Sequence, residues 1–125
     1  MTQTRRSDDE LPWAIQKWGW RFHHVGIPTG ERRTGERYLP ELKFFTSGFE
    51  RSPFGIEWMR FDKDCPLPEL VKTIPHVAFE VDDVNKVLEQ NNFKILIMPN
   101  SPCEGVRVAM IESDGAPVEL IEFSK

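Results

Sequence analysis

The tetrapeptide HVGI at residues 24–27 has a counterpart in HVAF at residues 76–79, and this repeat decides the fold. A second match follows, because IEWMRF at residues 56–61 corresponds to VELIEF at residues 118–123. Each half of the chain therefore opens on a strand that begins with His and Val, and closes on a strand that carries Glu among apolar residues. Such internal similarity predicts two modules of related structure.

The second half has the clearer pattern of secondary structure. Short apolar runs predict strands, and a polar segment with helical spacing begins at Asp82 or Asp83, either of which can cap a helix. DGAP at residues 114–117 predicts a hairpin turn. We expect a strand, a helix and three further strands, over residues 76–81, 82–92, 93–99, 105–113 and 116–123.

The first half departs from this order. The sequence distance from its His to its Glu is ten residues shorter than in the second half, and no helical pattern follows its first strand. We therefore expect the first module to lack the helix. The predicted elements are a strand at residues 21–28, a charged loop at 29–37, two or three strands within 38–61 with turns near Gly48 and Pro53, and a Pro-rich linker at 62–75.

The N-terminal segment carries a predicted helix that would replace the missing one. Residues 10–18 have apolar side chains at helical spacing, with Asp9 placed to cap them. Without a helix, Val25 and Ile27 would form a bare apolar face on the first strand, which proteins in water avoid. The helix, from the same chain or from a partner, would cover that face with three side chains, Leu11, Ile15 and Trp18.

These boundaries divide the chain into two parts. Residues 1–20 are an N-terminal extension with a short helix, and residues 21–124 form a single domain. The modules of that domain span about residues 21–62 and 75–124.

Alternation along the strands predicts a polar cluster on one surface. In HVAFEV the apolar residues after His76 share one face, so His76 lies on the other. The repeat gives His24 the same orientation and assigns His23 to the apolar face, where we interpret it as structural. Each repeated Glu also lies opposite apolar neighbours. Four side chains are thus predicted to line one concave surface: His24, Glu57, His76 and Glu119.

This arrangement resembles the vicinal oxygen chelate superfamily, which includes glyoxalase I, methylmalonyl-CoA epimerase, fosfomycin- and bleomycin-resistance proteins and extradiol dioxygenases. The resemblance rests on HHVGIP at residues 23–28, PHVAFEVDDVNKVLE at 75–89 and DGAPVELIEF at 114–123, and is weak over residues 29–55. It implies an α+β protein in which two βαβββ-type modules form a cupped eight-stranded mixed sheet, here with the first module lacking its usual helix. It also implies a homodimer.

The resemblance further implies a metal site. Carried over by position, His24, Glu57, His76 and Glu119 would bind a divalent metal, and Glu119 would also move a proton, a role that Glu57 could share. Imidazole and carboxylate ligands independently suit Zn, Ni, Fe, Mn or Co. Arg107 alternates with valines, and could reach into the cup to bind a substrate carboxylate or phosphate.

The function that the resemblance implies is a glyoxalase-like, metal-dependent lyase or isomerase that acts on a small vicinal-oxygen substrate. Two alternatives stay open at this point. One is a metal-free protein of the same fold that binds and sequesters a small molecule such as an antibiotic. The other is a ring-cleaving dioxygenase.

Composition and charge indicate which kinds of partner the protein is suited to bind. A chain of 125 residues with a net charge of −4 fits one globular domain and gives no broad electrostatic reason to bind nucleic acid or an anionic membrane. No apolar run is long enough to span a bilayer, and acidic residues stand where a signal peptide needs apolar ones. Cys65 and Cys103 are interpreted as free thiols. We expect a cytoplasmic protein with a small-molecule partner.

Overall fold

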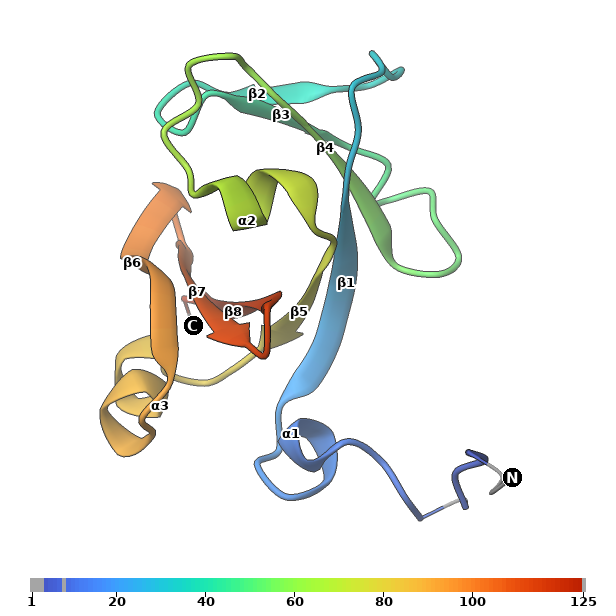
Figure 1. Cartoon of the computed structure of the whole chain (residues 1–125), viewed down its shortest axis with the longest axis vertical. Coiled ribbons are helices and arrows are strands. Elements are labelled where there is room, and N and C mark those ends of the chain that lie inside the picture. The colour runs from blue at the N-terminus through green and yellow to red at the C-terminus, as the bar shows by residue number, and fades with distance from the viewer. Residues whose placement is uncertain (1–3, 8, 125) are drawn as a thin grey trace.

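The computed structural model describes residues 4–7 and 9–124. Eight strands form one curved mixed sheet in the order β2-β3-β4-β1-β5-β8-β7-β6 (Figure 1). The α+β class with a cupped eight-stranded sheet is therefore confirmed. The strands are β1 (Arg21–Pro28), β2 (Arg37–Leu39), β3 (Phe44–Ser47), β4 (Ile56–Phe61), β5 (His76–Glu80), β6 (Lys94–Cys103), β7 (Val106–Ser113) and β8 (Ala116–Phe123).

The strands of the sequence repeat occupy the centre of the sheet. β1 and β5, which open the two halves, pair with each other antiparallel. β4 and β8, which close the halves, pair in parallel with β1 and β5, with Gly26 opposite Glu57 and Ala78 opposite Glu119. The sheet therefore brings the opening and closing strands of both halves together, although they are far apart in sequence.

The helices follow the predicted asymmetry between the halves. In the second half α3 (Val84–Gln90) lies between β5 and β6, and the side chain of Asp83 caps it by accepting a hydrogen bond from the Lys86 backbone N–H at 3.1 Å. In the first half the segment from residue 29 to residue 36 contains no helix, as predicted. The βαβββ order of the second module and the missing helix of the first are both confirmed.

A helix that the sequence analysis missed lies within the predicted linker. α2 (Glu69–Thr73) begins after Pro68, which occupies its N-cap position. Its Val71 is fully buried and borders a small internal space with Met59 and Met110 of the sheet. α2 thus lies within the curve of the sheet, as Figure 1 shows.

The N-terminal helix is shorter than predicted and packs elsewhere. α1 (Trp13–Gln16) follows Pro12, so Asp9 does not cap it. Its Ala14 and Ile15 pack against the apolar core of the second half. Within one chain, the prediction that residues 10–18 cover Val25 and Ile27 is therefore wrong, and cover by a partner's helix stays a prediction.

Aromatic packing explains why α1 lies against the second half. Trp20 is buried in the core cluster, with its ring centroid 5.7 Å from that of Phe79. Trp18 packs at centroid distances of 5.1 Å from Trp20 and 6.0 Å from Phe93. These contacts hold the N-terminal segment beside the second half, and Leu11 stays exposed. None of the helices described in residues 4–7 and 9–124 is long and apolar enough to cross a membrane.

Candidate metal centre

A cavity of about 460 Å³ opens on the concave face of the sheet, and we call it the cup. Strands from both halves of the chain contribute to its wall. Its polar lining comes chiefly from β1, β2, β4 and β8, and its apolar lining from β3, β7 and β8. The residues around it include His23, His24, Arg37, Phe44, Phe49, Glu57, Met59, Cys103, Val108, Glu119, Ile121 and Phe123.

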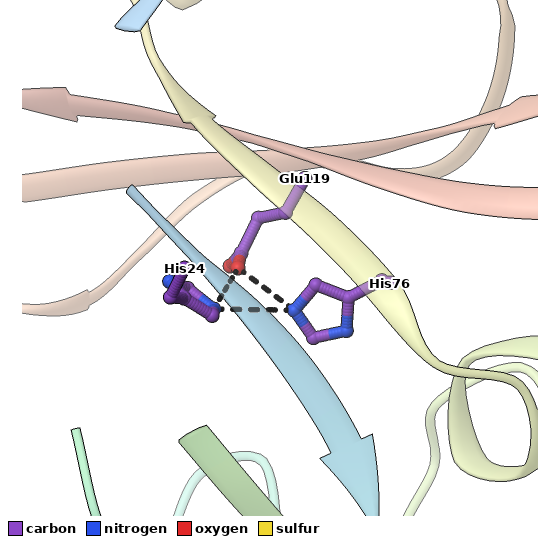
Figure 2. Close-up of side chains that lie close together, drawn as sticks. All are labelled: His24, His76 and Glu119. Atoms are coloured by element: carbon purple, nitrogen blue, oxygen red, sulfur yellow. Dashed lines mark hydrogen bonds and ion pairs between the residues drawn. The ribbon is translucent and has the colours of Figure 1, made fainter. Parts of the chain in front are cut away.

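Three of the four predicted ligands meet within this concave face. The Nε2 atoms of His24 and His76 are 3.3 Å apart, and Glu119 Oε1 lies 3.3 Å from the first and 3.2 Å from the second. Figure 2 shows the two imidazoles and the carboxylate turned toward one another from β1, β5 and β8. Both histidines are almost completely buried. We call these three residues the trio.

Gly26 makes the close approach of β1 and β5 possible. It lies directly opposite His76 in the antiparallel pair. A Cβ atom at position 26 would be 2.1 Å from Cε1 of the His76 ring, which is too close for two carbon atoms that are not bonded to each other. The absence of a side chain therefore leaves the space that the His76 imidazole occupies.

Glu57, the fourth predicted ligand, lies at the edge of the trio. Its Oε1 is 3.5 Å from Nε2 of His24, and its side chain is one-fifth exposed. Burial raises the pKa of Glu57, opposed by the charge of His24, while the nearby Glu119 carboxylate raises it further. Glu57 is therefore more easily protonated than an ordinary glutamate.

Glu119 has the opposite electrostatic character. Burial favours its neutral form, but hydrogen bonds from His24 and His76 outweigh burial and lower its pKa to about 2. For His24, burial disfavours the charged form, yet the hydrogen bond to Glu119 and the charge of that carboxylate raise its pKa overall. The two glutamates of the cup thus have pKa values displaced in opposite directions.

The donor atoms of the trio fit a divalent metal. Metal–nitrogen and metal–oxygen bonds of roughly 2.0–2.2 Å place neighbouring ligand atoms roughly 3 Å apart, close to the spacing found here. Metal-binding histidines use one ring nitrogen and hold the other by a hydrogen bond. Nδ1 of His24 has such a contact with Nδ1 of His23 at 2.8 Å. Nδ1 of His76 is buried without a partner among the described residues.

His23 faces the cup, which corrects the prediction that it lies on the apolar face with Val25. The pairing of β1 with β5 shifts register between Phe22 and His24, and this β-bulge breaks the strict alternation of side chains. His23 consequently lines the cup beside His24 and stacks on Phe49 at a centroid distance of 4.8 Å. The bulge thus gives His24 a hydrogen-bonding neighbour.

Arg107 does not reach the cup, so its prediction as a substrate-binding residue is wrong. It lies on the opposite face of β7 from Val108 and donates a hydrogen bond to Asn85 of α3 at 3.0 Å. Both faces of β7 carry apolar residues, and it is Val106 and Val108, not Arg107, that line the cup. The cup is instead lined by Arg37 of β2, which the sequence analysis assigned to the charged loop at residues 29–37.

The comparisons with known proteins rest on structure alone. No protein-family model and no curated protein matches the chain. A hypothetical protein from Bacillus halodurans C-125 superposes with a TM-score of 0.65 at 16% identity, covering 85% of this chain and 96% of its own. Methylmalonyl-CoA epimerase from Mycobacterium tuberculosis superposes with a TM-score of 0.62 at 15% identity, covering 84% and 89%. The chain therefore shares the fold of these two proteins, as the sequence resemblance implied.

Proposed function

We propose that the protein is a metal-dependent lyase or isomerase, glyoxalase-like, that acts on a small substrate with vicinal oxygen atoms. The observation that carries the proposal is the convergence of His24, His76 and Glu119 within 3.3 Å of one another on the concave face. The fold shared with an enzyme named as an epimerase supports the same reaction class.

In this proposal the trio binds the metal, and Glu57 lies at the edge of the site. A divalent metal held there would act as a Lewis acid that polarises a substrate carbonyl. Zn, Ni, Fe, Mn and Co all accept this donor set.

Glu57 is the better supported of the two candidate bases. Proton transfer at carbon needs a carboxylate that reaches the substrate and is not itself held by the metal. Glu119 contacts both imidazoles of the trio, whereas Glu57 contacts only His24, at 3.5 Å, and lines the cup. We therefore assign the proton transfer to Glu57 and the anchoring of the metal chiefly to Glu119.

The rest of the cup would orient the substrate and limit access of water. Apolar side chains, among them Phe44, Val108 and Ile121, form much of its wall. Arg37 lies at the same cavity and is exposed, which places a guanidinium where a substrate carboxylate could bind.

A ring-cleaving dioxygenase is the second candidate. Two histidines and one carboxylate with open positions are the ligand set of non-haem Fe(II) oxygenases, and the trio is such a set. Phe49 and Phe123 would offer aromatic contacts to a catechol ring.

Both candidate functions require a metal bound by the trio, and the metal content of the protein tests this requirement. The protein is purified without chelator from metal-replete cells, and its metals are measured by elemental analysis. We expect close to one equivalent in the wild type, less than about a tenth in Glu119→Gln, and no change in Glu104→Gln, an exposed control. Less than about a tenth of an equivalent in the wild type would overturn the proposal and favour the metal-free binding protein.

Activity assays then separate the reaction classes. Lactoylglutathione turnover, thiol transfer to fosfomycin, epimerisation of a 2-substituted acyl thioester and catechol cleavage are measured with the metal-loaded protein. Glu57→Gln should lower kcat for proton transfer by about 10²–10⁴-fold while the metal content stays near that of the wild type. Full activity in Glu57→Gln would show that another group moves the proton.

A further inference from the structure

A second pocket lies on the face of the sheet opposite the cup, and we call it the arginine pocket. Trp58 alternates with Glu57 along β4, and Ser47 alternates with Thr46 along β3, so Trp58 and Ser47 turn away from the cup. The pocket has a volume of about 440 Å³. Its main lining residues are Arg32, Arg33, Ser47, Arg51, Ser52 and Trp58.

The pocket occupies the place that the missing helix leaves. The segment from residue 29 to residue 36 connects β1 to β2, where the second half has α3. Instead of apolar helix residues, this loop sets the guanidinium of Arg33 over the Trp58 ring, 4.4 Å from its centroid. That cation–π contact fixes one positive charge at the wall of the pocket.

Three arginines face this space without an acidic partner. Within residues 4–7 and 9–124, Arg21, Arg37 and Arg60 each pair with a carboxylate at 2.8–3.5 Å. No such pair is found for Arg32, Arg33 or Arg51 in the same part of the chain, although the charge of Arg32 contributes to lowering the pKa of Glu36, which pairs with Arg60. Three unpaired guanidinium groups at one pocket of a chain with net charge −4 make a local concentration of positive charge.

The floor of the pocket supplies a second observation that points to a ligand. Ser47 is only 8% exposed and borders the pocket. No hydrogen bond of its side chain to another described residue is found, and its hydroxyl is not fully enclosed, so it stays open to the pocket. A ligand oxygen in the pocket would accept the hydrogen bond that the protein leaves open.

We propose that the arginine pocket binds a small molecule through a phosphate group, at a site separate from the cup. Guanidinium groups bind phosphate oxygens with paired, charge-assisted hydrogen bonds, and the Ser47 hydroxyl donates one more. Three arginines suit a ligand with more than one negative charge, such as a diphosphate. The volume is that of a small-molecule pocket, and the negative charge of the whole chain disfavours a nucleic acid strand.

Inorganic pyrophosphate is the probe for this site. Its binding is measured by calorimetry at constant ionic strength, with sulfate and chloride as comparison anions. Amide and indole N–H spectra give the location, because the Trp58 indole borders the pocket and the other three tryptophans do not. We expect saturable pyrophosphate binding, weaker sulfate binding and a shift of the Trp58 indole signal.

Matched variants decide whether the arginine pocket is the site. Arg33→Gln and Arg51→Gln should each weaken pyrophosphate binding by about tenfold or more, and Ser47→Ala by a smaller factor. Arg5→Gln makes the same change of charge outside the pocket and should have no effect. The proposal would be overturned if Arg5→Gln weakened binding equally, or if the wild type showed no saturable binding. It would also be overturned if Glu119→Gln abolished pyrophosphate binding while Arg51→Gln left it unchanged. The last result would place the anion in the cup.

Discussion

Gly26 is the residue on which the geometry of the trio depends most directly. Gly26→Ala would place a methyl group within 2.7 Å of three atoms of the His76 ring. Because His76 is buried, the ring cannot move aside without disturbing the sheet, and overpacking of this kind costs about 1–3 kcal/mol. We expect a lower free energy of unfolding and loss of metal binding, measured by denaturant unfolding and by metal titration.

Gly30→Ala is the matched control for this change. A Cβ atom at Gly30 meets no atom within 4 Å, and its backbone is not in the left-handed region. The variant should unfold and bind metal like the wild type. Wild-type metal affinity in Gly26→Ala would contradict the role that we assign to this glycine.

Tyr38 offers a separate test at the rim of the cup. Its hydroxyl donates a hydrogen bond to Asp62 at 2.6 Å, and this bond, with a smaller contribution from burial, raises the pKa of Tyr38 to about 12. Ionisation removes the donated proton and sets two negative charges together, so the neutral phenol is favoured. Tyr38 is the single tyrosine of the chain, so absorbance at alkaline pH follows it alone.

The expected result is a midpoint near pH 12 in the wild type and one near 10 in Asp62→Asn, the ordinary value for tyrosine. Asp64→Asn, which alters a neighbouring carboxylate that pairs with Lys43, should shift the midpoint much less. An ordinary midpoint in the wild type would mean that the Tyr38–Asp62 hydrogen bond does not persist in solution.

The sequence repeat, together with the alternation of side chains along a strand, was enough to predict that the residues of the trio share one face of the sheet. His24, His76 and Glu119 follow from that alternation. His23 did not, since a β-bulge leaves no sign in the residue types. Arg107 failed for another reason: β7 carries apolar residues on both faces, so the pattern does not say which face lines a cavity.

At the scale of elements, the N-terminal segment gives the clearest stability prediction. Trp18 packs on Trp20 and Phe93, whereas Trp13 is 64% exposed and its ring contacts the ammonium of Lys17. Trp18→Ala should lower the free energy of unfolding by about 1–2 kcal/mol, less than a fully buried tryptophan. Trp13→Ala, the matched control, should cost less than about 1 kcal/mol. Equal losses in denaturant unfolding would contradict the packing described.

Short helices set the limit of what the sequence could predict among the elements. The strands and α3 have apolar periods long enough to recognise, and α3 also has its cap at Asp83. α1 and α2 span only four and five residues, about one turn each. Tertiary contacts such as the burial of Val71, rather than helix propensity, stabilise such turns. The sequence analysis therefore predicts α1 too long and does not predict α2.

For the whole molecule, metal binding should couple to global stability. The trio comes from three strands of both halves, and the unfolded chain does not hold these side chains together. A metal that binds only the folded state at a concentration of 100 times its Kd stabilises the protein by about 2.7 kcal/mol. Thermal unfolding should show a higher Tm with added Ni²⁺ or Zn²⁺, reversed by chelator. Glu119→Gln should show little change, and an equal shift in that variant would point to metal binding elsewhere.

The domain boundaries, the homodimer and the cytoplasmic location stay predictions. They follow from sequence patterns and from the resemblance, whereas the sheet of a single chain bears on none of them. The overall architecture, in contrast, could be predicted well, because a repeat in sequence becomes a repeat of strand order once each opening strand pairs with its closing strand.

The parallel pairing of β1 with β4 and of β5 with β8 also has a consequence for folding kinetics. Each pairing, like the junction between β1 and β5, joins segments that are distant in sequence, so the chain must close long loops before any two members of the trio meet. Topologies dominated by such contacts fold slowly. If the trio assembles after the rate-limiting step, a bound metal would leave the refolding rate nearly unchanged and would lower the unfolding rate.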